Sequence, residues 1–201
     1  MTTKTDEFIE EEKLKFINNE VLTSSILGGL ARGYPVYKQN TKEDIRKEFR
    51  NLLRDKLEKY AHFYKTQVGS TQHIKNIKNF ADEISAEKIG ILKKSRFRIG
   101  RVQKLLNLYL KYLWVLNWIP KPPHCPFDSR VIEKLGLNKE IQWTKLDSEE
   151  GYDKLVKSAN EKAKNKSLSV AEWELQFWNQ NNKNPKKVKN TNTNLKFTYL
   201  K

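Results

Sequence analysis

An amine and a carboxylate are the first candidates for chemistry in this chain. Lys104 lies in a strongly apolar segment, and Asp128 follows it after a proline-rich stretch. The stretch around Lys104 is rich in cations and has no acid; its basic residues are Lys93, Lys94, Arg96, Arg98, Arg101, Lys104 and Lys111. A predicted helix begins there, and the free N–H groups of a helix N-terminus bind phosphate. An amine and a carboxylate beside such a helix N-terminus are suited to chemistry on a nucleic acid.

The helix predicted over about 100–118 is apolar on nearly every side, which is typical of a buried, central helix. Its polar exceptions Lys104, Asn107 and Lys111 follow at i, i+3 and i+7, so they share one helix face. A buried amine without a partner is costly. We therefore expect this face to line a cleft, with a solvated helix edge as the alternative.

A proline-rich loop leads from this helix to Asp128. Pro126 favours an extended conformation at Cys125. Asp128 lies near the start of a further predicted helix, over 127–135, and capping of that helix is its plain structural role. His124 and Cys125 are close enough in sequence to reach the same cleft. A Cys–His nucleophilic pair is disfavoured, because neighbouring residues of an extended segment point apart.

The arrangement resembles the helix-hairpin-helix DNA glycosylase superfamily (the HhH-GPD family), as a divergent member. Gly100, four residues before Lys104, stands where the family has the first glycine of its hairpin. Pro126-Phe127-Asp128 matches the family's proline–hydrophobic–aspartate element. Val102 replaces the second hairpin glycine, and the interval from the lysine to the aspartate is longer than usual. The resemblance covers about residues 86–135.

This resemblance implies a DNA N-glycosylase that flips a damaged or modified base into a pocket. Asp128 is then the carboxylate that stabilises charge on the sugar, and Lys104 attacks C1′ if the enzyme is also a β-lyase. The expected base pocket consists of Asn107, Lys111, Trp114, His124, Cys125 and Phe127, with Trp118 and Tyr34 as further wall candidates. The expected DNA-backbone contacts are Lys93, Lys94, Arg96, Arg98, Gly100, Arg101 and Arg130. Base repair and defence against modified phage DNA both stay open.

The composition agrees with a folded protein that binds a polyanion. The chain has 201 residues, a formal net charge of +15 and 11% aromatic residues. The aromatic content argues against wholesale disorder, and the charge indicates a nucleic-acid partner. We expect DNA as the partner and no obligate protein partner. Two other functions stay open: a non-catalytic nucleic-acid-binding module, and a helical regulator of an acidic protein. A lysine-rich composition without any such ligand is the remaining alternative.

Cys125 is the only cysteine. A single cysteine excludes an intrachain disulfide and argues against Cys-ligated zinc or iron–sulfur sites, so we expect neither a metal nor another cofactor. No apolar run reaches the roughly 18–20 residues of a membrane span. The acidic N-terminus does not resemble a signal peptide. The sequence therefore predicts a cytoplasmic protein without a membrane partner.

Helical periodicity recurs along nearly the whole chain. We expect an all-α bundle of about eight helices, with a helix-hairpin-helix element at about 86–118 and a cleft between two small lobes. The helices are predicted over 13–30, 42–66, 70–84, 86–92, 100–118, 127–135 and 149–163, with a last one from Ser167 or Ser169. Thr41 is the expected cap of the second helix, and a loop is expected at 28–35. Residues 1–12 are an acidic lead-in, 13–181 the helical domain, and 182–201 a basic tail with a short strand at 195–200.

Overall fold

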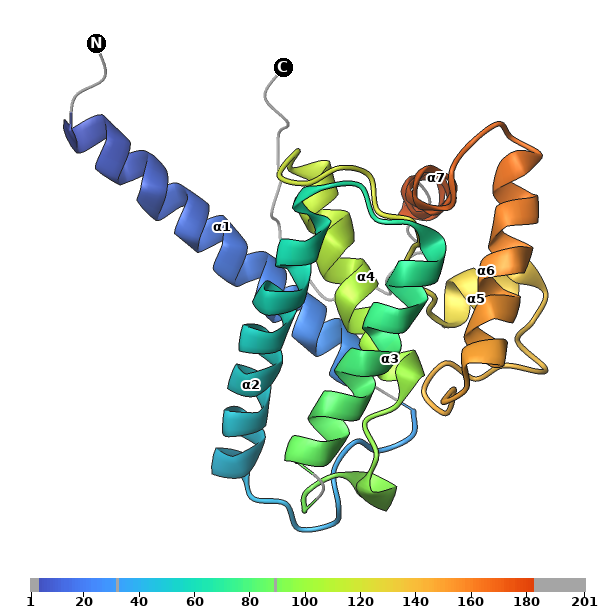
Figure 1. Cartoon of the computed structure of the whole chain (residues 1–201), viewed down its shortest axis with the longest axis horizontal. Helices are drawn as coiled ribbons and strands as arrows, with labels where there is room; N and C mark the ends of the chain where they lie inside the picture. The colour runs from blue at the N-terminus through green and yellow to red at the C-terminus, as the bar shows by residue number, and fades with distance from the viewer. Residues whose placement is uncertain (1–3, 32, 89, 183–201) are drawn as a thin grey trace, which may run out of the picture.

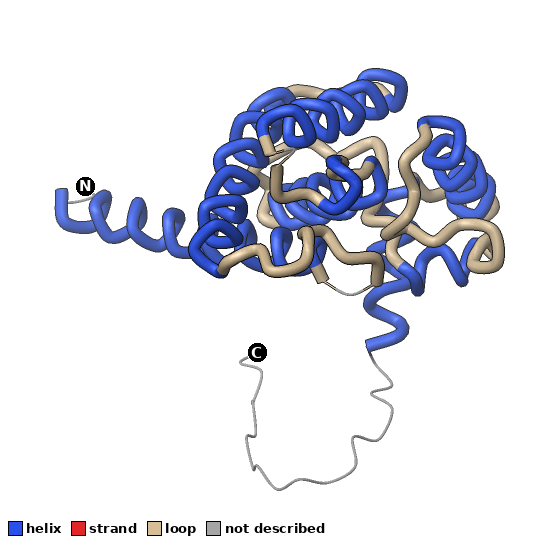
Figure 2. Tube along the Cα trace, turned by 90° about the horizontal axis from the view of Figure 1, so that it is seen from below, coloured by secondary structure: helices blue, strands red, loops and turns tan. Residues whose placement is uncertain are grey.

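Helical periodicity in the sequence is realised as an all-α fold (Figure 1). The computed structural model describes residues 4–31, 33–88 and 90–182, and within them Figure 2 shows helices and loops but no strand. The helices are α1 (Lys4–Leu30), α2 (Glu43–His62), η1 (Phe63–Lys65), α3 (Ser70–Glu87), η2 (Lys93–Ser95), α4 (Ile99–Val115), α5 (Ser129–Leu135), α6 (Glu149–Lys164) and α7 (Val170–Asn182), where η marks a 3-10 helix. The all-α prediction is confirmed. The two-lobe organisation stays a prediction.

The helix α4 is the centre of the fold. It contacts α1, α2, α3 and α6. Its leucines Leu105, Leu106 and Leu110 are fully buried. Because neighbouring helices cover most of its circumference, a sequence that is apolar nearly all round becomes a core helix. This position also fixes where the polar side chains of α4 can point.

Two glycines bring α1 close to α4. A Cβ atom at Gly29 would lie 2.3 Å from Cγ of Leu105, and one at Gly28 would lie 2.9 Å from Cδ2 of Leu108. The helix runs through both glycines to Leu30, so the predicted break at residue 28 is wrong. Each glycine costs roughly 1 kcal/mol of helix propensity, which packing against α4 offsets. The N-terminal part of α1, including residues 4–12, projects away from the other helices (Figures 1 and 2).

The connection between α3 and α4 differs from the predicted hairpin. The predicted short helix over 86–92 is wrong, because α3 continues to Glu87 and residues 90–92 are not helical. The loop that follows pairs with residues 36–38 through two backbone hydrogen bonds of 2.8 Å. These long-range bonds satisfy the backbone groups that a local helix would have used. A longer connection that contains η2 therefore replaces the tight turn.

Side-chain caps begin α5 and α6, whereas α2, α3 and α4 begin without one. Asp128 caps α5, and Ser148 caps α6 by accepting a hydrogen bond from the N–H of Gly151. Thr41 does not cap α2; its hydroxyl donates instead to the carbonyl of Lys38. The predicted basic tail beyond residue 182 and its strand lie outside the described residues. None of the helices in residues 4–31, 33–88 and 90–182 combines the length and apolar character that a membrane crossing needs.

Candidate active site

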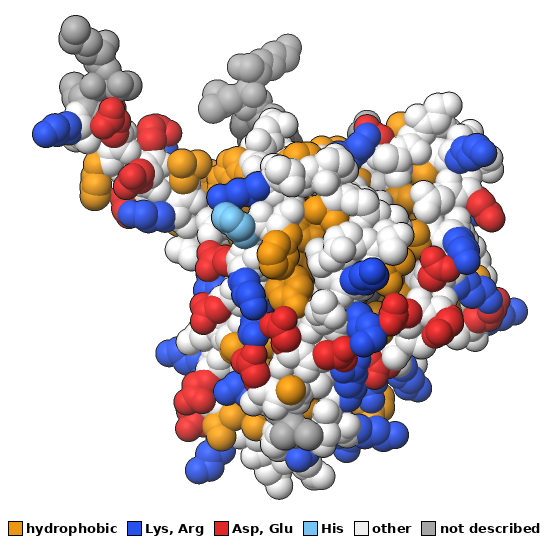
Figure 3. Space-filling view, in the orientation of Figure 1, with side chains coloured by type: hydrophobic (Ala, Val, Ile, Leu, Met, Phe, Trp, Pro, Cys, Tyr) orange, Lys and Arg blue, Asp and Glu red, His pale blue; other side chains and the backbone are white. Residues whose placement is uncertain are grey.

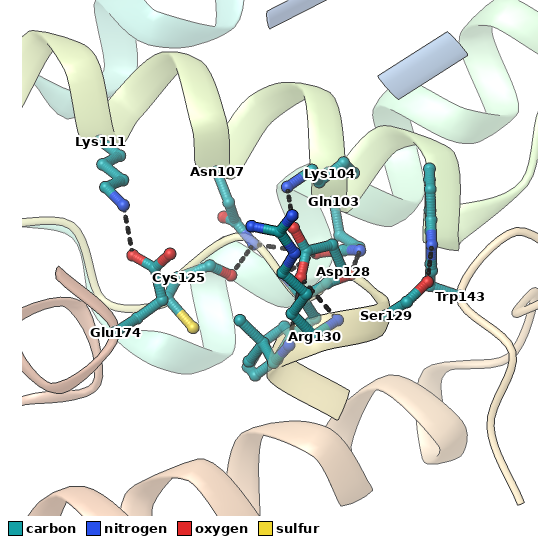
Figure 4. Close-up of polar contacts among 12 residues, drawn as sticks. Gln103, Lys104, Asn107, Lys111, Cys125, Asp128, Ser129, Arg130, Trp143 and Glu174 are labelled. Carbon is teal, nitrogen blue, oxygen red and sulfur yellow. Dashed lines mark hydrogen bonds and ion pairs between the residues drawn. The ribbon is translucent and has the colours of Figure 1, made fainter. Parts of the chain in front are cut away.

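Lys104 and Asp128 form an ion pair. Nζ of Lys104 donates to Oδ2 of Asp128 over 3.0 Å (Figure 4). Both side chains are largely buried, with exposed fractions of 11% and 21%. Oδ1 of Asp128 accepts the backbone N–H groups of Arg130 and Val131, which is the cap of α5. The two oxygens thus divide two tasks: one caps a helix and the other faces the lysine.

The environment of Asp128 favours its ionised form. Burial acts to raise the pKa of the carboxyl, but the charge and hydrogen bond of Lys104 act against it, together with the two capping N–H groups. The net result is a pKa of Asp128 below its ordinary value. A carboxylate of this kind is suited to stabilising a positive charge and is a weak base.

The pair faces a cavity formed by α1, α4, α5, α7 and the loop at 142–144. The cavity volume is about 430 Å³, within the range of roughly 300–1,000 Å³ that is usual for small-molecule sites. Most of the exposed lining is apolar, and much of it is aromatic or aliphatic; these residues are Leu108, Tyr112, Pro126, Trp143 and Trp178. A flat ring can therefore be enclosed beside the ion pair.

A second ion pair lies on the same cavity wall. Nζ of Lys111 donates to Oε2 of Glu174 over 2.7 Å, and these side chains are 12% and 4% exposed (Figure 4). Burial raises the pKa of Glu174, although Lys111 acts in the opposite direction. Trp178 follows Glu174 by one turn of α7, and the Lys111 ammonium lies 5.3 Å from its ring centroid. Sequence reasoning missed Glu174, whose only local signal is this i, i+4 pairing with a tryptophan.

Two buried amides hold the loop that precedes α5. The side chain of Gln103 donates to the carbonyl of Phe127 over 2.7 Å and accepts its N–H over 3.0 Å. Asn107 donates to the carbonyl of Cys125 over 2.8 Å. Both amides are fully buried. They hold the backbone on either side of Pro126 against α4. This contact positions the loop that leads to the cap of α5. Gln103 was not among the predicted site residues.

Most of the predicted base pocket lies in the core and not in the cavity. Five predicted pocket residues are absent from the lining; they are Asn107, Trp114, His124, Cys125 and Phe127. Four of them are at most 1% exposed, and Trp114 packs against the core. The physical reason is the register of α4, which directs Lys104, Leu108 and Lys111 into the cavity and Asn107 toward the interior. Lys111 is the predicted pocket residue that does line the cavity.

Asn107 belongs to a buried chain of hydrogen bonds. Its Oδ1 lies 2.7 Å from Nε2 of His73, and its Nδ2 donates to the hydroxyl of Tyr152 over 3.1 Å. That hydroxyl lies 2.9 Å from Nδ1 of His124. Burial lowers the pKa of His73 to about 4, and burial together with the nearby His73 lowers the pKa of His124 well below its ordinary value. Both rings are therefore neutral, and the network serves to position α3, α4 and α6.

Cys125 and His124 are not arranged as a nucleophilic pair. Nε2 of His124 is bound to the hydroxyl of Ser70 at 2.8 Å, and Nδ1 is bound to Tyr152. Burial raises the pKa of the Cys125 thiol well above its ordinary value. A buried thiol of this kind lacks the thiolate form that reacts.

The N-terminus of α4 is closed by groups of the same chain. The N–H of Ile99 donates to Oδ1 of Asp147 over 3.1 Å, and the N–H of Gly100 donates to the carbonyl of Leu146 over 2.9 Å. A Cβ atom at Gly100 would lie 1.8 Å from the carbonyl oxygen of Trp143, so only glycine permits this close approach. The carboxylate of Asp147 thus occupies the predicted phosphate-binding site, and Gly100 allows the backbone of Trp143 to pack against α4.

Two of the arginines predicted to contact DNA are engaged inside the protein. Arg101 is 3% exposed, and its guanidinium donates to the carbonyls of Gly29 and Tyr34. Burial, with a smaller effect of a neighbouring arginine, lowers the pKa of Arg101 to about 10. Arg96 pairs with two carboxylates, one of which is Asp147. Both arginines therefore hold chain segments together.

The other predicted cations lie at the surface. Lys94 and Arg130 are exposed, and Lys93 and Arg98 are half-buried. The Arg98 guanidinium lies 4.2 Å from the ring centroid of Tyr34, and Arg130 stands on the cavity wall beside Asp128. On the face seen in Figure 3, basic and acidic side chains are interspersed and do not form a continuous basic surface. Of these four, only Arg130 lines the cavity.

The chain matches no protein-family model, and neither a curated protein nor a solved structure is significantly similar to it. In the part of the chain that the structure describes, no three His, Cys, Asp or Glu side chains come together as a metal site. The geometry of the cavity is therefore the basis on which a function is proposed.

Proposed function

We propose that the protein is a DNA N-glycosylase that excises a modified base after flipping it into the cavity beside Lys104 and Asp128. One observation carries the proposal: an ionised carboxylate lies 3.0 Å from an amine on the wall of a cavity with aromatic sides. The resemblance to the helix-hairpin-helix glycosylases assigns the same two residues from sequence alone. The two arguments are independent, since one uses spacing along the chain and the other uses geometry.

Asp128 acts on the sugar. When the N-glycosidic bond breaks, its electron pair leaves with the base and positive charge develops on the sugar ring. A preorganised carboxylate stabilises that charge, particularly where water is excluded. The lowered pKa of Asp128 keeps the group negative at neutral pH. In an enzyme that only excises the base, water then adds to C1′.

Lys104 determines whether the strand is also cut. An amine that attacks C1′ forms a bond to the sugar as the base leaves, and opening of the ring gives a Schiff base that permits strand cleavage. The amine has to lose a proton before it attacks. That proton passes to water, and Oδ2 of Asp128, 3.0 Å away, stays ionised and holds the amine in place through a hydrogen bond. Lyase activity and Schiff-base trapping therefore depend on Lys104, and base excision depends on Asp128.

The aromatic walls offset the cost of flipping. Extrusion of a base from the stack costs a few kcal/mol, whereas stacking on an aromatic side chain contributes about 1–3 kcal/mol per base. Tyr112 and Trp143 supply such surfaces in the cavity. Arg130 is exposed on the same wall, where it can contact a phosphate.

The test uses the purified full chain and duplexes that carry oxidised, deaminated, alkylated or hypermodified bases, assayed for abasic sites and for borohydride-trapped adducts. Asp128→Asn retains a good helix cap and should lose excision, and Lys104→Gln should lose trapping. Lys154→Gln is the matched control, because Lys154 pairs with Glu140 in an exposed ion pair away from the cavity; this variant should keep both activities. Unchanged activity in Asp128→Asn and Lys104→Gln would refute the assignment.

A non-catalytic nucleic-acid-binding module is the second candidate. This candidate is favoured because both oxygens of Asp128 already have partners within the chain. A structural role, in which the Lys104–Asp128 ion pair fastens α5 to α4, is enough to explain these contacts. Salt-sensitive DNA binding without a product from any base would support this candidate over the enzyme.

A further inference from the structure

We infer that Glu174 and Lys111 form the subsite that reads the flipped base, and that the base is neutral and presents a hydrogen-bond donor beside an acceptor on one edge. The inference rests on the proposed glycosylase function and specifies its substrate class. It assigns a role to Glu174, which lies far from the family-like segment in sequence and reaches the cavity from α7.

The two ion pairs line one cavity at different positions along α4. Lys104 and Lys111 are separated by two turns of α4, which is about 10 Å along the helix axis. A base projects from C1′ of its sugar, so a group that acts on C1′ and a group that reads the far edge of the base must be separated in this way. The Lys104–Asp128 pair suits the sugar, and the Lys111–Glu174 pair suits the base edge (Figure 4).

Both members of the second pair keep hydrogen-bonding capacity for a ligand. Oε2 of Glu174 accepts from Lys111, whereas Oε1 has no hydrogen-bond partner among the described residues. An ammonium has three donors, and Glu174 takes one of those on Lys111. The Glu174 side chain is only 4% exposed, but Oε1 is not among the fully buried atoms that lack a partner, so it stays accessible from the cavity to a hydrogen-bond donor. An N–H of the base can donate to Oε1, and an adjacent acceptor on the base can accept a hydrogen bond from Lys111.

The charges around Trp178 argue against a cationic base. The Lys111 ammonium lies 5.3 Å and the Arg130 guanidinium 5.7 Å from the centroid of this ring, so its electron-rich faces already attract two cations. The described residues that line the cavity include three cations and two carboxylates, and Lys104 is the third cation. A positively charged N-alkylated base would meet like charges there. Oxidised and deaminated bases are neutral and carry N–H beside C=O, so they fit the subsite.

The experiment compares excision by the full wild-type chain of 8-oxoguanine, hypoxanthine and uracil with excision of 7-methylguanine and 3-methyladenine. A further duplex carries N1-methylhypoxanthine, which is neutral but lacks the donor. We expect kcat/KM for at least one neutral base to exceed that for either cationic base, and N1-methylation to lower excision of hypoxanthine by about 10- to 100-fold, as loss of a hydrogen bond to a charged group predicts.

Variants then locate the effect. Glu174→Gln should lower kcat/KM for the preferred neutral base about tenfold and reduce the penalty of N-methylation. Glu172→Gln, on the same helix but outside the cavity lining, should change neither. Thermal unfolding of each variant is measured in parallel, and Lys111→Gln replaces Glu174→Gln if the latter does not fold.

The outcomes separate this inference from the proposed function. Equal excision of cationic and neutral bases, or a penalty for N-methylation that Glu174→Gln leaves unchanged, overturns the base-reading role while the glycosylase stands. Failure of the wild-type chain to excise any base overturns both.

Discussion

Replacement of Asp128 by asparagine removes one charge and retains the cap. Asparagine caps helices about as well as aspartate, so α5 keeps its N-terminal hydrogen bonds to Arg130 and Val131. What is lost is the charge-assisted bond from Lys104, whose side chain is 11% exposed. A hydrogen bond to a charged group contributes about 1.5–3 kcal/mol, and we expect Asp128→Asn to lower the free energy of unfolding by that amount. Asp128→Ala should cost about 1 kcal/mol more, because it also removes the cap.

Urea unfolding followed by circular dichroism measures this quantity, in a double-mutant cycle with Lys104→Met. The coupling energy between Lys104 and Asp128 should be about 1.5–3 kcal/mol. In thermal unfolding each kcal/mol corresponds to roughly 2–4 °C for a chain of this length. A coupling energy below about 0.5 kcal/mol, the value of an exposed ion pair, would refute the reasoning that this pair is desolvated and strong.

The pH dependence of the same difference gives a second check. The pKa of Asp128 is lowered in the folded protein, so its ionisation contributes stability that is present above the unfolded-state pKa of about 3.9 and is lost as the pH falls through the folded-state pKa. The stability difference between wild type and Asp128→Asn should therefore shrink as the pH falls below about 4. A difference that stays constant there would contradict the assigned pairing.

Three further outcomes are expected. Gly100→Ala should destabilise the fold by more than about 3 kcal/mol in urea unfolding, since its Cβ would overlap the carbonyl oxygen of Trp143; a loss below 1 kcal/mol would contradict that contact. Asn107→Leu should cost about 1–3 kcal/mol for each partner left unpaired, and a neutral effect would mean that the network of Asn107 contributes nothing. The pKa of His73 is about 4 in the folded protein, so its neutral form contributes stability above about pH 6.5 that is lost as the pH falls toward 4; wild-type stability should fall in this window, and a flat profile between pH 6.5 and 4 would exclude burial of neutral histidine.

In α4, the sequence predicted the buried surface but not the direction of every polar side chain. Apolar periodicity predicted a central helix, and the same residues are its buried surface. The prediction that Lys104, Asn107 and Lys111 share a polar face was too coarse, because sequence spacing gives angular neighbourhood but not which neighbour covers each side. Asn107 turned toward His73 and Tyr152, which lie in α3 and α6. Both partners are distant in sequence, so no local pattern identifies them.

The cation-rich stretch at the start of α4 shows the same limit. The number of cations predicted a phosphate-binding site. Asp147, from a segment nearly fifty residues later, instead accepts the N–H of Ile99 and pairs with Arg96. Charge along the chain does not determine charge in space, because distant carboxylates neutralise local clusters. The predicted DNA contact at Arg96 became an internal contact for this reason. Arg101 became internal because it donates to the backbone carbonyls of Gly29 and Tyr34.

The helical class, the central helix and the capping of α5 by Asp128 are predictable from the sequence, because they depend on periodicity and on groups a few residues apart. Its family resemblance also singled out Lys104 and Asp128, the pair that lies 3.0 Å apart in the fold. Which side chains share the cavity depends on how the helices pack in the fold. Glu174 and Trp178 come to Lys111 from the far end of the chain, and their meeting depends on the packing of whole helices, which no spacing along the sequence records.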